Sequence, residues 1–124
     1  MMRTVLMALA LAGGAAAATT TWGGPHVEMI VTDRGARLEF DCAHGTIDEP
    51  LRIDSDGAFR LKGTFVPERS GPSRDGREPR PAEAIYSGTV KDDTMTLRIV
   101  VDGQDRENTY ALARDRPGTV RKCR

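Results

Sequence analysis

Apolar side chains fall on every second position in several separate stretches of this chain. This alternation is typical of a strand with one buried face, because successive side chains of a strand point to opposite sides. We expect each stretch to be a strand, and we expect further strands over residues 85–90 and 119–123. The alternating positions are Val27, Met29 and Val31; Leu38, Phe40 and Cys42; Phe59, Leu61, Gly63 and Phe65; Met95, Leu97, Ile99 and Val101; and Tyr110 with Leu112.

Residues that favour tight turns separate these stretches. Asp and Gly are concentrated at residues 33–35, 55–57, 91–93 and 102–103, where they predict turns between antiparallel strands. Gly63 falls on the apolar face of its strand, and a glycine there is typical of a bend or a close backbone approach.

The pattern predicts an all-β fold. After the first two dozen residues, no stretch combines the apolar spacing and the caps of a helix. We expect one domain over residues 25–124, built as an antiparallel meander of seven or eight strands. Because such a sheet must protect its edges, we favour closure into a small barrel, with a two-sheet β-sandwich as the alternative.

The first eighteen residues have a different character. Arg3 is followed by an apolar run from Thr4 to Ala12 and then by small residues up to Ala18. This order is typical of a cleavable signal peptide, and the run is too short for a membrane-spanning helix. We therefore expect residues 1–18 to be a signal peptide, residues 19–24 to be a short disordered segment, and the mature protein to be periplasmic or secreted.

Cys42 and Cys123 are the two cysteines of the chain. In an exported protein they have one internal pairing, so we predict a disulfide. The chain-entropy model assigns about 4 kcal/mol to closing a loop of about eighty residues. The alternatives are Cys42 and His44 as metal ligands, or Cys42 as a nucleophile, but no second Cys-x-x-Cys or His-x-x-His element accompanies them.

The charge balance argues against two classes of partner. The whole chain has 18 basic and 18 acidic side chains, and loss of the signal peptide removes one basic residue. A nucleic-acid-binding surface or a polybasic membrane-binding segment requires a clear basic excess. We expect no nucleic-acid partner and no membrane span in the mature protein.

The densest group of chemically capable side chains lies within residues 41–50. His44 with Asp48 and Glu49 could act as a general base or bind a divalent cation. The alternative is a strand end fixed by the disulfide, with these side chains solvated at the rim. Residues 54–57 resemble part of a calcium loop but lack its required first and last carboxylates, so we expect an Asx-type hairpin turn.

The longest irregular stretch, residues 67–81, contains four arginines and four prolines. Loops of this length are often functional or mobile, so its arginines are candidate partner contacts, with a flexible surface loop as the alternative. We find no Gly-x-Ser-x-Gly, phosphate-loop or His-Glu-x-x-His motif, and we assign no catalytic residue, cofactor or metal. The arginines are Arg69, Arg74, Arg77 and Arg80.

Residues 42–51, which read Cys-Ala-His-Gly-Thr-Ile-Asp-Glu-Pro-Leu, resemble a motif in a group of short exported bacterial proteins of uncharacterised function. Asp56-Gly57, Gly71-Pro72 and the segment from Tyr86-Ser87-Gly88 to Met95-Thr96-Leu97 extend the resemblance over essentially the whole mature domain. The resemblance implies bacterial export and a shared fold, and it brings no activity.

Among functional classes we favour a monomeric binding or interaction module, which presents its long loop and strand-end rim to a protein or small ligand. The alternatives are a small hydrolytic or metal-assisted enzyme built around His44, and a structural accessory protein of the cell envelope. The interior distinguishes two forms of binding, because a filled barrel leaves only the rim and loops as sites, whereas a hollow barrel implies an enclosed ligand.

Overall fold

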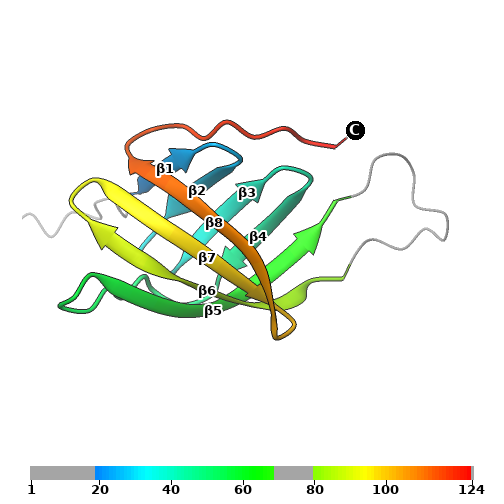
Figure 1. Ribbon diagram of the computed structural model, residues 1–124, viewed down its shortest axis with the longest axis horizontal. Coiled ribbons are helices and arrows are strands. Elements are labelled where there is room, and N and C mark those ends of the chain that lie inside the picture. Colours follow the sequence, from blue (N-terminus) through cyan, green and yellow to red (C-terminus); the bar gives the residue numbers. More distant parts are fainter. Residues whose placement is uncertain (1–18, 69–79, 124) are drawn as a thin grey trace, which may run out of the picture.

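Eight strands follow one another along the chain in a computed structural model, which describes residues 19–68 and 80–123 (Figure 1). The described part contains no helix, so none there is long and apolar enough to cross a bilayer. The all-β prediction is confirmed. The strands are β1 (Thr20–Gly24), β2 (Val27–Val31), β3 (Ala36–Phe40), β4 (Ala43–Ile47), β5 (Ala58–Pro67), β6 (Ala82–Lys91), β7 (Thr94–Val101) and β8 (Gln104–Arg114).

The sheet closes on itself. Each strand pairs antiparallel with the next, and β8 pairs with β1 through Trp22 opposite Arg114 and Gly23 opposite Ala113. The predicted closed barrel is confirmed and the β-sandwich alternative is wrong. Closure pairs the first strand with the last, which protects edges that an open sheet of this size would expose.

The disordered segment predicted over residues 19–24 is wrong, because residues 20–24 form β1. Trp22 supplies the physical reason: its indole is 3% exposed in the core, and the guanidinium carbon of Arg114 lies 4.8 Å from the ring centroid. Burial of a tryptophan of this kind contributes about 3–5 kcal/mol, which offsets the cost of ordering a short strand. The β-branched residues Thr20 and Thr21 also favour extended backbone.

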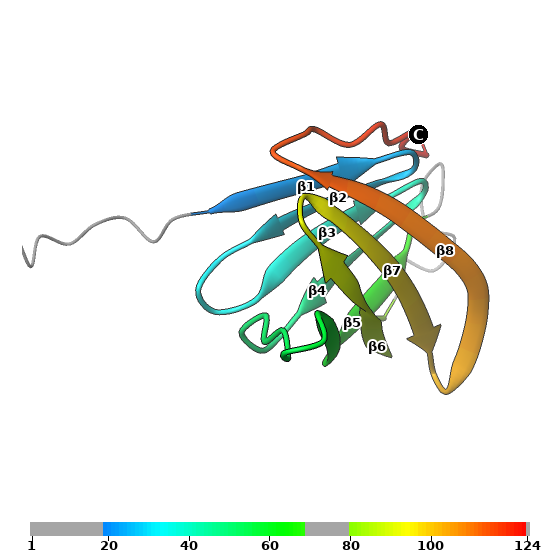
Figure 2. The ribbon, with the colours of Figure 1, turned by 60° about the vertical axis from the view of Figure 1, so that its left-hand side comes forward.

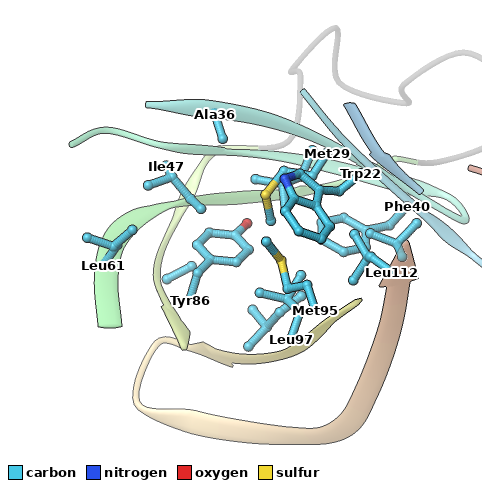
Figure 3. Close-up of a cluster of buried hydrophobic side chains, with 14 of the residues drawn as sticks. Trp22, Met29, Ala36, Phe40, Ile47, Leu61, Tyr86, Met95, Leu97 and Leu112 are labelled. Atoms are coloured by element: carbon cyan, nitrogen blue, oxygen red, sulfur yellow. The ribbon is translucent and has the colours of Figure 1, made fainter. Parts of the chain in front are cut away.

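The interior of the barrel is filled by side chains. Figure 3 shows the ring of Tyr86 among the core side chains, in the same cluster as Met29 and Met95, and all three residues are fully buried. The Tyr86 hydroxyl donates to the backbone oxygen of Thr64 at 2.6 Å, and burial raises the pKa of this phenol far above its usual range. This packed interior leaves the rim and the loops as the places for a site.

Two glycines allow this packing. A Cβ atom on Gly45 would lie 2.2 Å from the Tyr86 hydroxyl oxygen, so the missing side chain makes room for the phenol. A Cβ atom on Gly63 would lie 1.8 Å from the backbone oxygen of Thr46 on the neighbouring strand. The predicted close backbone approach at Gly63 is confirmed.

The connections alternate between the two ends of the barrel. Those between β1 and β2, β3 and β4, β5 and β6, and β7 and β8 lie at one end, which we call the mouth and which is on the right in Figure 1.

The predicted turns are confirmed: Asp92 and Asp102 have left-handed φ values of 54° and 50°. The Asp54 carboxylate accepts hydrogen bonds from the backbone nitrogens of Asp56 and Ala58, at 2.8 and 2.9 Å, which confirms the Asx-type turn.

The C-terminal tail, residues 115–123, crosses the outside of the barrel toward the mouth (red in Figure 1). The short strand predicted in its last five residues is wrong, since among the described residues this stretch forms a single isolated bridge, between Thr119 and Pro25. The tail crosses several strands instead of following one, so no continuous ladder forms. Further along, the backbone nitrogen of Cys42 donates to the Arg121 oxygen at 3.2 Å.

The tail ends in the predicted disulfide, which is confirmed. Cys123 is bonded to Cys42 across a sequence separation of 81 residues, with the two Cα atoms 4.8 Å apart. The alternation placed Cys42 on a strand, but β3 ends at Phe40 and Cys42 lies in the turn that follows, with a φ of 53°. Because its sulfur is bonded, Cys42 is neither a metal ligand nor a nucleophile in this state.

Candidate functional site

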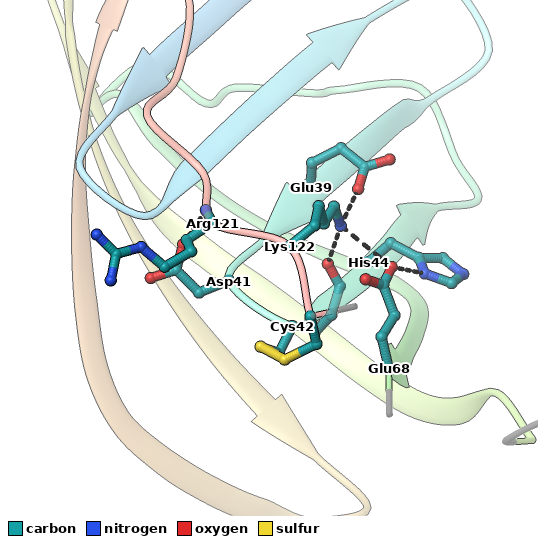
Figure 4. Close-up of polar contacts among 9 residues, drawn as sticks. Glu39, Asp41, Cys42, His44, Glu68, Arg121 and Lys122 are labelled. Atoms are coloured by element: carbon teal, nitrogen blue, oxygen red, sulfur yellow. Dashed lines mark hydrogen bonds and ion pairs between the residues drawn. A yellow bond between two sulfur atoms is a disulfide. The ribbon is translucent and has the colours of Figure 1, made fainter. Parts of the chain in front are cut away.

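His44 belongs to a group of polar side chains that fastens the end of the tail (Figure 4). Its Nδ1 atom donates to the Glu68 carboxylate at 2.7 Å, and the Lys122 ammonium donates to the same carboxylate at 3.1 Å. Lys122 also forms an ion pair with Glu39 and donates to the backbone oxygen of Ala43 at 2.8 Å. We call Glu39, His44, Glu68 and Lys122 the tail cluster, and it attaches the tail to β3, β4 and the end of β5.

The electrostatics of the tail cluster support this attachment. Partial burial alone would raise the pKa of Glu68, but hydrogen bonds from His44 and Lys122 bring it below its ordinary value. Burial alone would lower the pKa of Lys122, but its hydrogen bonds to Glu39 and Glu68 raise it. Both groups are therefore charged over the whole neutral range, and each holds the other in place.

The two acids predicted beside His44 lie elsewhere. β4 runs from the mouth to the opposite end, so Glu49 is roughly 15 Å from His44 along the strand direction. Asp48 accepts a hydrogen bond from the Thr46 hydroxyl and Glu49 accepts one from the Lys62 backbone nitrogen, both at 2.7 Å. Within residues 19–68 and 80–123, no three His, Cys, Asp or Glu side chains gather closely enough to hold a metal ion.

The loop arginines are only partly placed by the structure. Arg69, Arg74 and Arg77 lie outside the described residues. Arg80 is described and exposed, two positions before the start of β6. It therefore lies at the mouth, on the strand-end rim that we predicted from the sequence as a candidate partner contact.

A cleft of about 610 Å³ opens at the mouth. Its walls come from four places: Pro25 and His26 in the β1–β2 turn, Asp41 in the β3–β4 turn, Pro67 at the end of β5, and residues 109–111 of β8. This volume is within the range of small-ligand pockets in proteins. The cleft therefore combines apolar and polar groups in one concave site on the described rim.

Aromatic rings form the floor of the mouth cleft. The ring centroids of Phe65 and Tyr110 lie 5.6 and 5.3 Å from that of Phe40, in tilted arrangements. These are the favourable geometries for aromatic pairs. Phe40 and Phe65 are buried, whereas Tyr110 is half-buried and faces the cleft. The floor is therefore apolar and held by contacts within the barrel.

Asp41 and His26 form a polar rim beside this floor. The His26 Nδ1 atom donates to one Asp41 carboxylate oxygen at 2.5 Å, and the backbone nitrogen of Arg121 donates to the other at 2.7 Å. The bond from Arg121 is the main cause that lowers the pKa of Asp41, and His26 adds to it. A negative charge thus stands at the rim, and the same carboxylate joins the rim to the tail.

The cleft exists because pairing between β1 and β8 stops early. Continuing the observed register would place Pro25 opposite Ala111, and a proline has no N–H to donate to a ladder. His26 then adopts a left-handed φ of 70° and turns the chain into β2. β8 itself continues toward the mouth without β1 beside it, as Figure 2 shows.

Sequence reasoning did not find this cleft. Phe40 and Tyr110 were identified as inward strand positions, but their meeting at one end of the barrel depends on strand order and register. The Gly24-Pro25 pair is the one local signal for the opening, since it indicates where the first strand must leave the sheet. No pattern in the sequence marks Thr109 as a lining residue.

Fold and cleft together define a class of protein: an eight-stranded meander barrel with a packed interior and an open mouth, fastened by a disulfide-bonded tail. Comparison with protein-family models, with curated proteins and with solved structures gives no match. Evidence about its function therefore comes from the chemistry of the mouth.

Proposed function

We propose that the protein is an exported binding or interaction module whose binding site is the mouth cleft. The observation that carries the proposal is the contrast between a filled interior and an open, aromatic-floored mouth. A barrel with Tyr86, Met29 and Met95 packed at its centre has no room for an enclosed ligand. Binding then falls to the rim, where apolar floor and polar edge occur together.

The cleft suits an apolar or aromatic side chain of a partner, or a small ligand with one apolar end. Tyr110 offers a half-buried ring, and the prolines Pro25 and Pro67 offer apolar walls. Asp41 and His26 at the edge can fix the orientation of a polar group. A second hollow near Thr21, Glu28 and Asp115 has no aromatic residue in its lining, so it lacks an equivalent floor.

Export is part of this proposal. The leader at residues 1–18 has the composition of a signal peptide, and a disulfide that fastens the tail needs an oxidising compartment to persist. Cleavage near Ala18 would leave β1 and the buried Trp22 intact. Mass spectrometry of the periplasmic and extracellular fractions tests this, and a product that retains its first eighteen residues would contradict it.

A blocked phenylalanine amide is a suitable probe for the cleft. In a titration followed by amide-resolved NMR, we expect shifts at Ala43, Tyr110 and their neighbours. Tyr110→Ala should weaken binding at least about tenfold, or about 1.4 kcal/mol, because the Tyr110 ring forms part of the cleft floor. Val90→Ala is the matched control, since Val90 is likewise partly buried against the core but lies beside the β6–β7 turn, at the end of the barrel opposite the mouth.

Shifts that map to the end of the barrel opposite the mouth, or an equal effect of the Tyr110 and Val90 substitutions, would show that the mouth is not the binding site. If the probe does not bind at millimolar concentration, the proposal that the cleft binds an apolar side chain is refuted.

A further inference from the structure

Within residues 19–68 and 80–123, part of the backbone edge of β8 has no strand beside it. Among the described residues, β1 pairs with β8 only at Arg114 and Ala113, and β7 occupies the other edge. Gly24 still lies alongside Ala111, since a Cβ atom on Gly24 would come within 1.9 Å of the Ala111 oxygen. Beyond that point the chain turns away, and the stretch from Thr109 to Ala111 lines the cleft.

Two hydrogen bonds show which groups of β8 face this open side. The backbone nitrogen of Arg114 donates to the Asp93 oxygen at 2.9 Å, toward β7, and that of Asp115 donates to the Thr21 oxygen at 2.6 Å, toward β1. Backbone N–H and C=O groups of a strand alternate between its two edges. The N–H and C=O of Thr109 therefore point away from β7 and into the cleft.

The composition of the lining agrees with this orientation. Thr109, Tyr110 and Ala111 are consecutive and all line the cleft, yet successive side chains of a strand point to opposite faces. The Tyr110 ring faces the cleft, so the outward-facing neighbours Thr109 and Ala111 can line the same space through their backbone groups. Natural edges are commonly protected by lysine or proline, and this stretch contains neither.

We propose that an extended segment of a partner polypeptide adds to β8 at Thr109 as a short strand and places one apolar side chain in the cleft. This inference rests on the proposed function and names the partner's chemistry. Free N–H and C=O groups on a strand edge are complementary to another extended backbone. The partner residue opposite Tyr110 would point inward like Tyr110, toward the rings of Phe40 and Phe65.

The length of the open edge limits the interaction. Gly24 bounds it on one side, and on the other an irregularity between Arg98 and Val100 shifts the register of β7 and β8. About three partner residues can pair, which predicts a weak, short-lived complex.

The experiment uses the full barrel and a blocked pentapeptide of threonine and valine with a central phenylalanine. Binding is followed by amide-resolved NMR and by hydrogen exchange of the Thr109 amide. We expect this amide to exchange rapidly in the free protein and to become protected on binding. Methylating the peptide nitrogens one at a time should weaken binding at alternate positions only, by about fivefold each.

Thr109→Pro removes the donor that faces the cleft, and we expect at least about fivefold weaker peptide binding with the thermal midpoint nearly unchanged, since proline is tolerated at such an edge. Thr109→Val keeps the N–H and is the matched control, expected to bind as the parent does. The hydrogen-exchange and methylation results decide the question without the variant if the proline disturbs the fold.

The possible failures are distinguishable. If the pentapeptide binds no better than blocked phenylalanine amide and nitrogen methylation has no periodic effect, strand addition is overturned while the mouth remains a binding site. If neither probe binds, both proposals fall. If sedimentation shows a dimer that Thr109→Pro dissociates, the edge belongs to a second copy of the chain and a partner segment is refuted.

Discussion

The bond between Cys42 and Cys123 should account for a large share of the stability of this protein. Its sequence separation of 81 residues means that breaking it frees a loop of about eighty residues in the unfolded chain. The chain-entropy expression for such a loop gives about 4.5 kcal/mol at room temperature. Small domains have about 5–15 kcal/mol in total, so the reduced protein should be close to unfolding.

Urea denaturation followed by tryptophan fluorescence measures this effect directly. Trp22 is the single tryptophan of the chain and is buried under Arg114, so its emission reports on barrel closure. At a typical slope of about 1–3 kcal/mol per molar urea, replacing both cysteines by serine should lower the midpoint by about 1.5–4.5 M. Chemical reduction of the parent should give the same midpoint, and reductant should leave the double-serine variant unaffected.

A loss below about 1 kcal/mol would refute the chain-entropy reasoning for this loop. It would mean that the backbone hydrogen bonds of the tail and the tail cluster persist in the unfolded ensemble and keep residues 42 and 123 close together. Alternatively, the disulfide would destabilise the folded state by an equal amount. A midpoint unchanged in both the reduced and the double-serine protein would have the same meaning.

Three further predictions concern the core and the tail. Tyr86→Phe should cost about 1–3 kcal/mol in urea denaturation, because a buried backbone acceptor loses its donor. Gly63→Ala should cost at least about 1–3 kcal/mol, since its Cβ would clash with a backbone oxygen; a neutral result would contradict the close approach. Asp41 and Glu68 have pKa values below their ordinary values, so both carboxylates stabilise the fold at any pH above those ordinary values. This contribution to the free energy of unfolding is lost as the pH falls through the lower pKa values of the folded state. Asp41→Asn with Glu68→Gln should therefore flatten the acid fall in the urea midpoint, and an unchanged fall would refute this assignment.

Most of the barrel could be predicted from alternation, because one buried face per strand is a local property of the sequence. The hairpin of β6 and β7 shows this well, with its inward residues and turn both visible. The tail disulfide could be predicted because two cysteines have one pairing. The strand order was also inferable, since short turns join neighbours in a meander.

The errors lie where tertiary contacts outweigh local pattern. Residues 19–24 were expected to be disordered, since the alternation begins only near residue 25, yet burial of Trp22 makes residues 20–24 the strand that closes the barrel. Residues 119–123 were expected to form a short strand, but the tail follows no single neighbouring strand. His44, Asp48 and Glu49 are close in sequence, but extended backbone separates His44 from the two acids. Glu68, which directly follows β5, takes the place beside His44.

The attachment of the tail also decides how the protein should be mounted for measurement. Cys123 lies beside the mouth through its bond to Cys42, whereas Thr20 pairs with Val31 at the far end of the barrel. A surface anchor or bulky fusion joined after residue 124 would crowd the cleft, while one joined ahead of residue 19 would leave it facing the solution. Sensor or display formats should therefore be built from the amino-terminal side.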